Sequence, residues 1–167
     1  MTNLVRTHGR CAEGARCVGS VPHGHWKVMT AVAAVRLGGG GLTAPFTIDG
    51  PVDGDVFVTY VERVLVPTLR PGDVVVMDNL AAHKRPDVRR LVEAAGAAVL
   101  YLPPYSPDLN PIEMIWSKVK RLLRSFAART VDALHDAFGR AFAAVTPGDV
   151  LGCFRHCGYA TGEGAPL

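Results

Sequence analysis

Two short apolar runs, separated by one amphipathic segment, constrain the fold of this chain more than any other feature of its sequence. Val74–Met77 follows a Pro-Gly turn and is closed by Asp78, and Val99–Leu102 is a second run of the same kind. Between them, Pro86 stands at a first-turn position, apolar residues recur on one helical face, and Gly96 ends the segment. Apolar runs of this length are typical of strands buried in a covered sheet. This strand, helix and strand order predicts an α/β fold.

The segments on the N-terminal side predict a hairpin and a further helix. Lys27–Arg36 and Leu42–Asp49 have the character of strands, and the four glycines at 38–41 suit the loop between them. The glycine run does not fit a phosphate-binding loop, because no Lys-Ser/Thr pair follows it and the next segment is strand-like. Apolar residues then recur at three- and four-residue steps, which predicts a helix that starts at an acidic cap, Asp53–Asp55, and ends at Pro67.

The last third of the chain is predicted to be helical. Pro111–Phe126 has the clearest amphipathic pattern, with a core-facing stripe of Ile112, Ile115, Val119, Leu122 and Phe126. Thr130 is expected to cap a helix that runs through Val145, and Thr146 to start a short final helix. The complete order of elements favours a mixed sheet flanked by helices.

Composition and charge exclude several classes of protein. With 49% hydrophobic and 20% charged residues, the chain is neither disordered nor fibrous. Its apolar stretches fall far short of the roughly 20 residues that cross a membrane, so we expect a cytoplasmic protein. A net charge of +3 does not by itself indicate a nucleic-acid partner. The four cysteines are expected to be free thiols, although His156 beside Cys157 leaves a zinc site open.

Two carboxylates are candidates for chemistry. Asp78 ends a predicted strand, and catalytic groups gather at the carboxyl ends of strands in open α/β sheets, although a turn or cap is the commoner role of an Asp-Asn pair. Glu113 points about 100° away from the preceding core residue. The residues expected on its helical face are Trp116, Ser117, Lys120 and Arg124. The basic members of this face could form a track for phosphates, which argues against a merely solvated surface.

The segment 102–113, LPPYSPDLNPIE, is too specific in sequence to be a generic loop. It follows VVVMDNLAAHK at 74–84, 34 residues lie between Asp78 and Glu113, and GHWK stands at 24–27. With these motifs the chain resembles the DDE-type transposases of bacterial insertion sequences in the mariner superfamily, from Arg6 to Tyr159. The resemblance implies an RNase H-like endonuclease domain over residues 1–160, followed by a C-terminal tail at 161–167.

The resemblance also implies a site and its chemistry. Three carboxylates of the family bind two divalent ions, Mg²⁺ or Mn²⁺, which promote the cleavage and transfer of DNA strands at the ends of a mobile element. Asp78 matches the second of these carboxylates and Glu113 the third, so both are expected to be catalytic metal ligands. The expected supporting residues behind them are Asn79, His83 and Asn110. The expected DNA-binding residues are Lys84, Lys118, Lys120, Arg121 and Arg124.

Simpler roles remain open for some of these residues. Asn110 is expected above all to cap the helix of Glu113, which does not exclude a role in orienting the carboxylate. A helix-entry or surface position is the simpler alternative for His83. Tyr105 is expected either to stack or to pack.

The family pattern places its first carboxylate on a central strand that precedes the segment matched here. We therefore expect a domain that is incomplete at its N-terminus, lacks that strand and is catalytically inactive as the isolated chain. A frameshift product, a wrongly chosen start and a decayed copy all remain open as explanations. Expected partners are DNA, a further copy of the chain and a complementing upstream segment; the expected location is on the DNA of a bacterial nucleoid.

Two other functions compete with a transposase. A non-catalytic remnant or accessory fragment could bind DNA, or a full-length transposase, through the basic face of the Glu113 helix. An unrelated hydrolase or nucleotide-binding enzyme is disfavoured, because the chain has no G-x-S-x-G, P-loop or G-x-G-x-x-G in the required context.

Overall fold

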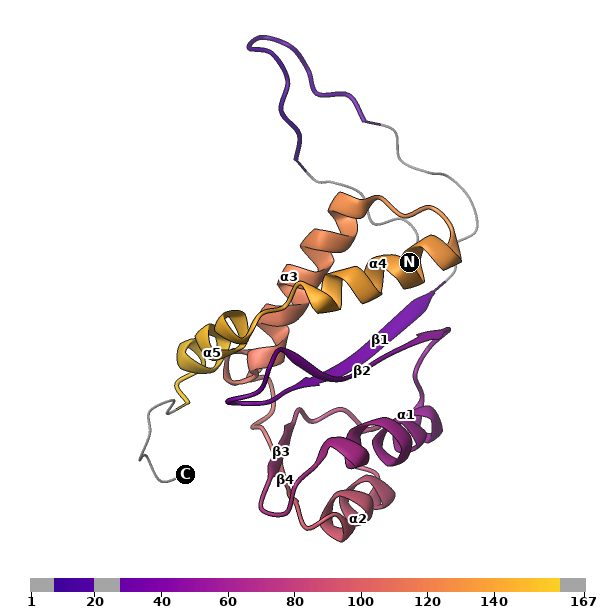
Figure 1. Ribbon diagram of the computed structural model, residues 1–167, viewed down its shortest axis with the longest axis vertical. Coiled ribbons are helices and arrows are strands. Elements are labelled where there is room, and N and C mark those ends of the chain that lie inside the picture. The colour runs from indigo at the N-terminus through magenta and orange to yellow at the C-terminus, as the bar shows by residue number, and fades with distance from the viewer. Residues whose placement is uncertain (1–7, 20–27, 160–167) are drawn as a thin grey trace.

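The computed structural model describes residues 8–19 and 28–159, and a β-hairpin lies at its centre (Figure 1). β1 (Met29–Val35) pairs antiparallel with β2 (Leu42–Asp49), and the register shifts once along the ladder. Both strands were predicted, although β1 begins two residues later than the predicted start. Lys27 and the GHWK motif at 24–27 lie outside the described residues.

A continuous helical segment follows the hairpin. It consists of α1 (Gly54–Tyr60), a π-helical turn η1 (Val61–Leu65) and a 3₁₀ turn η2 (Val66–Thr68). The predicted acidic cap is confirmed, since the Asp53 carboxylate accepts hydrogen bonds from the backbone N–H groups of Asp55 and Val56. The segment runs one residue past the predicted end, because the proline lies in the first turn of the 3₁₀ helix, where its missing N–H is not needed.

The central βαβ unit is present. β3 (Val74–Met77) and β4 (Ala98–Tyr101) pair in parallel, and α2 (Pro86–Ala94) connects them. Only one face of this two-stranded sheet is covered, so the prediction of fully buried strands is wrong. Val75 and Val99 face the helices, whereas the side chains that alternate with them, among them Val74 and Leu100, are about half exposed.

Three helices complete the described chain. α3 (Pro111–Phe126) has the predicted bounds and follows a 3₁₀ turn, η3 (Pro107–Leu109). α4 (Val131–Ala143) and α5 (Pro147–His156) begin at the predicted caps, where the Thr130 and Thr146 hydroxyls accept backbone hydrogen bonds. The prediction placed the end of α4 at Val145, two residues too late.

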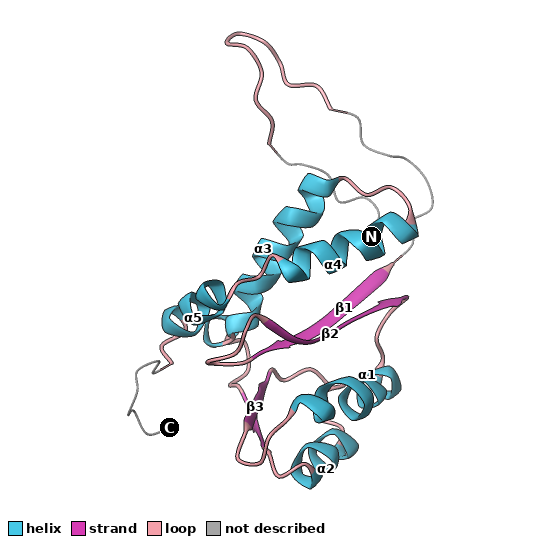
Figure 2. Cartoon of the chain, viewed as in Figure 1, coloured by secondary structure: helices cyan, strands magenta, loops and turns pink. Residues whose placement is uncertain are grey.

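The hairpin lies between two helical layers, with α3, α4 and α5 on one side and α1 and α2 on the other (Figures 1 and 2). β1 contributes to both. Met29, Ala31 and Val35 pack with the cluster of α3, α4 and α5, whereas Val32 and Ala34 pack with that of α1 and α2. The two hydrophobic clusters are therefore separate cores joined by one hairpin.

The buried face of α3 differs from the predicted stripe. Ile115, Val119 and Leu123 are buried, and Leu123 was not in the prediction. Trp116 was expected on the polar face, but its ring packs against Phe142 of α4 with centroids 6.2 Å apart. Both α4 and α5 contact α3, so its apolar face is wider than a single stripe.

The strands form two separate sheets, β1–β2 and β3–β4. Within residues 8–19 and 28–159 no strand joins them. The predicted tail at 161–167 lies outside the described residues. No helix in the described part of the chain is long and apolar enough to cross a membrane.

None of the four cysteines forms a disulfide; Cys11 and Cys17 are exposed, and Cys153 and Cys157 are buried.

Candidate active site

Asp78 follows β3 directly and stands where that strand ends. Its Oδ1 atom accepts a hydrogen bond from the backbone N–H of Leu80 at 3.0 Å, which makes a local Asx turn. The turn-forming role of the Asp-Asn pair is therefore real. The side chain is nevertheless 39% exposed, and its second oxygen remains available to a ligand.

His83 lies against Asp78. Its Nδ1 atom is 2.7 Å from the Asp78 carboxylate without a hydrogen bond to any described residue, and its ring is tilted against the ring of Phe57, with the centroids 4.4 Å apart. The hydroxyl of Tyr101 donates to the backbone carbonyl of His83 at 3.0 Å. The imidazole is 20% exposed, so His83 is not a surface histidine, although it stands in the turn that leads into α2. Contacts from two elements fix its position beside the carboxylate.

Glu113 occupies the first turn of α3. Its side chain is exposed, and the negative charge is favourable at this end of a helix. Asn110 stands at the N-cap position, but its side chain makes no capping hydrogen bond, so the expectation that it caps the helix is wrong. The preference for a cap fails because Pro111 and the preceding 3₁₀ turn already set the entry of the chain into the helix.

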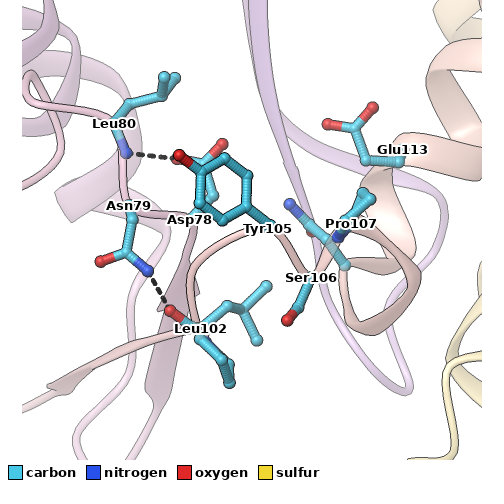
Figure 3. Close-up of a pocket in the computed structure, with 10 residues that line it drawn as sticks. Asp78, Asn79, Leu80, Leu102, Tyr105, Ser106, Pro107 and Glu113 are labelled. Carbon is cyan, nitrogen blue, oxygen red and sulfur yellow. Dashed lines mark hydrogen bonds between the residues drawn. The ribbon is translucent and has the colours of Figure 1, made fainter.

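The two carboxylates line one pocket, which encloses about 220 Å³. Figure 3 shows Asp78, Asn79 and Leu80 on one wall and Ser106, Pro107 and Glu113 on the other. The remaining lining residues are Leu102, Pro103, Tyr105 and Asn110. The side-chain amide of Asn79 donates to the carbonyl of Leu102, which ties the end of β3 to the end of β4. The structure thus brings together residues that lie 35 positions apart in sequence.

The predicted DNA-binding residues divide into two groups. Lys84, Lys120 and Arg121 are exposed, and Arg124 is half-buried. Lys118 instead forms an ion pair with Asp149 of α5 and is only 24% exposed. Its ammonium group stabilises the contact between α3 and α5 and is less available to a phosphate than the others.

Asp149 was not predicted as a partner of any candidate residue. The sequence does hold a signal for it, since Thr146 and Asp149 have the spacing of a capping box, and the structure shows both of its hydrogen bonds. The ion pair with Lys118 could not be read from that spacing, because it depends on how α5 packs against α3.

Asp149 predicts a specific pH dependence of stability. Hydrogen bonds from Lys118 and Thr146 lower the pKa of its carboxyl from 3.8 to about 2. A lowered pKa stabilises the fold above pH 3.8, and this contribution is lost as the pH falls through about 2. We expect Asp149→Asn to lower the free energy of unfolding at pH 7 by about 1 kcal/mol and to flatten its pH dependence between pH 4 and 2. Urea unfolding at several pH values measures both effects.

Asp132→Asn is the matched control for that experiment, because Asp132 is an exposed residue in the first turn of α4. We expect it to change the free energy of unfolding by less than about 0.5 kcal/mol. Equal effects of the two variants would show that the Asp149 contacts do not stabilise the protein.

The donor set fits one divalent cation. Mg²⁺ prefers oxygen ligands and is usually bound by one or two carboxylates together with substrate phosphates. Asp78 and Glu113 supply such carboxylates in the same pocket. In the part of the chain that the structure describes, no three His, Cys, Asp or Glu side chains gather into a metal site. Binding of either ion therefore stays a prediction.

The sequence model of the DDE superfamily endonucleases matches residues 2–135. The chain belongs to this superfamily. The expectation drawn from the sequence motifs is confirmed, and the match contains both Asp78 and Glu113. The DDE transposase family generally uses divalent metal ions.

Two known proteins show how this DDE endonuclease domain is related to transposases. The transposable element Tc1 transposase of Caenorhabditis elegans is 32% identical over 92 residues, which cover 50% of this chain and 34% of that protein. The crystal structure of the Mos1 strand transfer complex matches 91% of this chain and 46% of that chain, with a TM-score of 0.59 and 16% identity. The fold is thus the predicted RNase H-like one, and the chain spans less than half the length of either relative.

Proposed function

We propose that this chain is the catalytic portion of an insertion-sequence transposase, which cleaves and joins DNA strands. One observation carries the proposal: Asp78, at the end of β3, and Glu113, at the start of α3, line the same pocket. Membership in the DDE superfamily and the similarity to the Tc1 transposase support it. Such an enzyme would act on DNA in the cytoplasm of a bacterial host.

In this proposal Asp78 and Glu113 are the ligands of Mg²⁺ or Mn²⁺. A divalent ion bound there would polarise a phosphate and lower the pKa of an attacking water or 3′-hydroxyl. The Leu80 N–H donates to one oxygen of Asp78, and His83 packs against the same oxygen, so this side of the carboxylate is fixed by the protein. Asn79 and Asn110 are proposed to support the site, the first by linking the ends of β3 and β4.

The wider assembly is also part of the proposal. Three carboxylates and two ions act together in the family that the sequence resembles, so we propose that a further carboxylate joins Asp78 and Glu113 in the working enzyme. An upstream N-terminal segment or self-association with another transposase chain would supply it.

The basic face of α3 is proposed to carry the DNA. Lys120 and Arg124 lie two and three turns beyond Glu113 on the same face, about 10 and 16 Å along the helix axis. At this spacing, the two side chains could contact successive phosphates of a DNA strand that runs away from the pocket along α3. Lys84 and Arg121 extend the positive surface, whereas we expect Lys118 to contribute little, since Asp149 already pairs with it.

The experiment that tests DNA binding compares Lys120→Ala with Lys118→Ala and Arg63→Ala. We expect Lys120→Ala to weaken binding of a duplex oligonucleotide and to reduce the slope of log affinity against log salt by about 0.9, the loss of one phosphate contact. Arg63 is exposed on η1 and serves as the control for a lost charge away from the site. Fluorescence anisotropy between 50 and 200 mM salt gives both quantities. Equal losses from Lys120→Ala and Arg63→Ala, or binding that does not depend on salt, would contradict the proposed track.

A further inference from the structure

Tyr105 is presented to solvent in an unusual way. Its side chain is fully exposed, at 103% of its reference area. Its backbone has φ +56°, a left-handed conformation that residues other than glycine rarely adopt. The chain on either side is fixed: the Leu102 N–H donates to the carbonyl of Met77 at 2.8 Å, and the Leu109 N–H donates to Ser106 at 3.2 Å. An ordered turn therefore presents this ring to solvent.

The other three tyrosines have internal partners. Their hydroxyls donate to carbonyl groups at 2.9 to 3.0 Å, Tyr60 to Ala44, Tyr101 to His83 and Tyr159 to Leu109. Among the described residues, the Tyr105 hydroxyl has no hydrogen bond and its ring has no aromatic contact. Nothing in the packing of the described fold accounts for an aromatic side chain here.

The place of the ring indicates what it contacts. Tyr105 lines the pocket that holds Asp78 and Glu113, and in Figure 3 it is drawn between the two walls. Leu80, 58% exposed, adds a second apolar surface to the same pocket. A flat exposed ring beside acidic residues that would bind a phosphate through a cation suits a nucleobase, since every base offers a face for stacking.

We infer that Tyr105 is a stacking platform for the nucleobase next to the phosphate held at the Asp78–Glu113 pocket. The inference rests on the proposed function and deepens it, because it assigns a residue that positions the strand rather than one that takes part in the chemistry. Stacking on an aromatic ring is tolerant of base identity and typically changes affinity by about 5- to 150-fold for each base. Tyr105 would hold the strand end in register for the carboxylates, whatever its terminal base.

The test uses the whole chain and a duplex whose single-stranded 3′ end carries 2-aminopurine, a base whose fluorescence is quenched by stacking. We expect the wild-type protein and Tyr105→Phe to quench this base. Tyr105→Ala should remove the quenching and weaken binding of the single-stranded end at least about 5-fold, with little change for blunt duplex. Rescue by phenylalanine separates stacking from a role of the hydroxyl group.

Tyr105→Gly tests whether a loss of quenching in Tyr105→Ala comes from the missing ring or from a disturbed fold. Glycine adopts a positive φ without strain, so we expect this variant to unfold at the same temperature as the wild type or higher, and still to lose the quenching. Equal quenching by wild type, Tyr105→Ala and Tyr105→Gly, with DNA binding intact, would overturn the inference and leave the proposed function standing. A wild-type chain that binds no DNA at any salt concentration would overturn both.

Discussion

We expect Asp78→Asn and Glu113→Gln each to weaken binding of Mn²⁺ at least about 10- to 100-fold, which is the loss seen when only a group behind a metal ligand is replaced. Each change removes one negative charge and one carboxylate ligand but keeps the size of the side chain. Titration followed by the electron paramagnetic resonance of free Mn²⁺ measures the affinity directly and does not require catalytic activity. The two variants should also behave alike, because both carboxylates face one pocket.

Glu93→Gln is the matched control for charge. Glu93 is an exposed glutamate on α2 that pairs with Arg89 at 3.3 Å, and it does not line the pocket. Its replacement should leave Mn²⁺ affinity unchanged within about twofold, since an exposed charge away from the pocket acts only through screened solvent. Unchanged Mn²⁺ affinity in Asp78→Asn would place the ion elsewhere and favour the competing role of a DNA-binding fragment without catalysis.

A second readout locates the ion in the chain. Fe²⁺ with ascorbate and hydrogen peroxide produces radicals that cut a polypeptide near the bound metal. Because β3 and α3 meet at the pocket, we expect cuts near both residues 78 and 113 and their joint loss in either variant. Cuts near only one of the two positions would show that the carboxylates do not share an ion.

The second large effect concerns the core behind Glu113. Ile115 is 1% exposed and belongs to the cluster that α3 forms with α4 and α5. We expect Ile115→Ala to lower the free energy of unfolding by about 2 to 5 kcal/mol, because it removes buried methyl groups and leaves a cavity. This is a large part of the stability of a typical domain, so a fraction of the protein should be unfolded at moderate temperature. Urea unfolding with an unchanged slope against denaturant measures the loss.

Met114→Ala is the neighbouring control. Met114 is 39% exposed on the same helical turn, so its truncation should cost less than about 1 kcal/mol and should not create a closed cavity. If the two variants lost the same stability, the assignment of Ile115 to a tightly packed core would be wrong. Ile115→Ala also shows how much Mn²⁺ binding is lost when the protein is merely destabilised. This loss can be compared with the loss caused by replacing the proposed ligands.

Most of the secondary structure could be predicted because local signals agree with one another. The bounds of α3 follow from Pro111 and from a long apolar period, and the hydroxyls of Thr130 and Thr146 mark the starts of the next two helices. The rotation of α3 could not be predicted. Trp116 and Leu123 become part of the core only because α4 and α5 pack on two sides of the helix, and that packing has no local signature.

In the candidate site, too, some features could be predicted from local sequence and others depend on tertiary contacts. Asp78 and Glu113 stand out through sequence motifs, and the structure brings them to one pocket. The ion pair of Lys118, the buried side of His83 and the failure of Asn110 to cap its helix all depend on contacts with distant residues. Sequence periodicity reports which residues share a face, but it does not report which neighbour covers that face.

The two carboxylates of the pocket are attached to different hydrophobic cores, one on each side of the hairpin. Asp78 follows Met77, which belongs to the cluster of α1 and α2, whereas Glu113 belongs to the helix that carries Ile115 in the other cluster. The separation of the carboxylates is therefore set by the way two independently packed halves meet across β1 and β2. A cation bound by both would act as a removable cross-link between these halves, and by mass action it would favour the closed arrangement over any state in which they move apart.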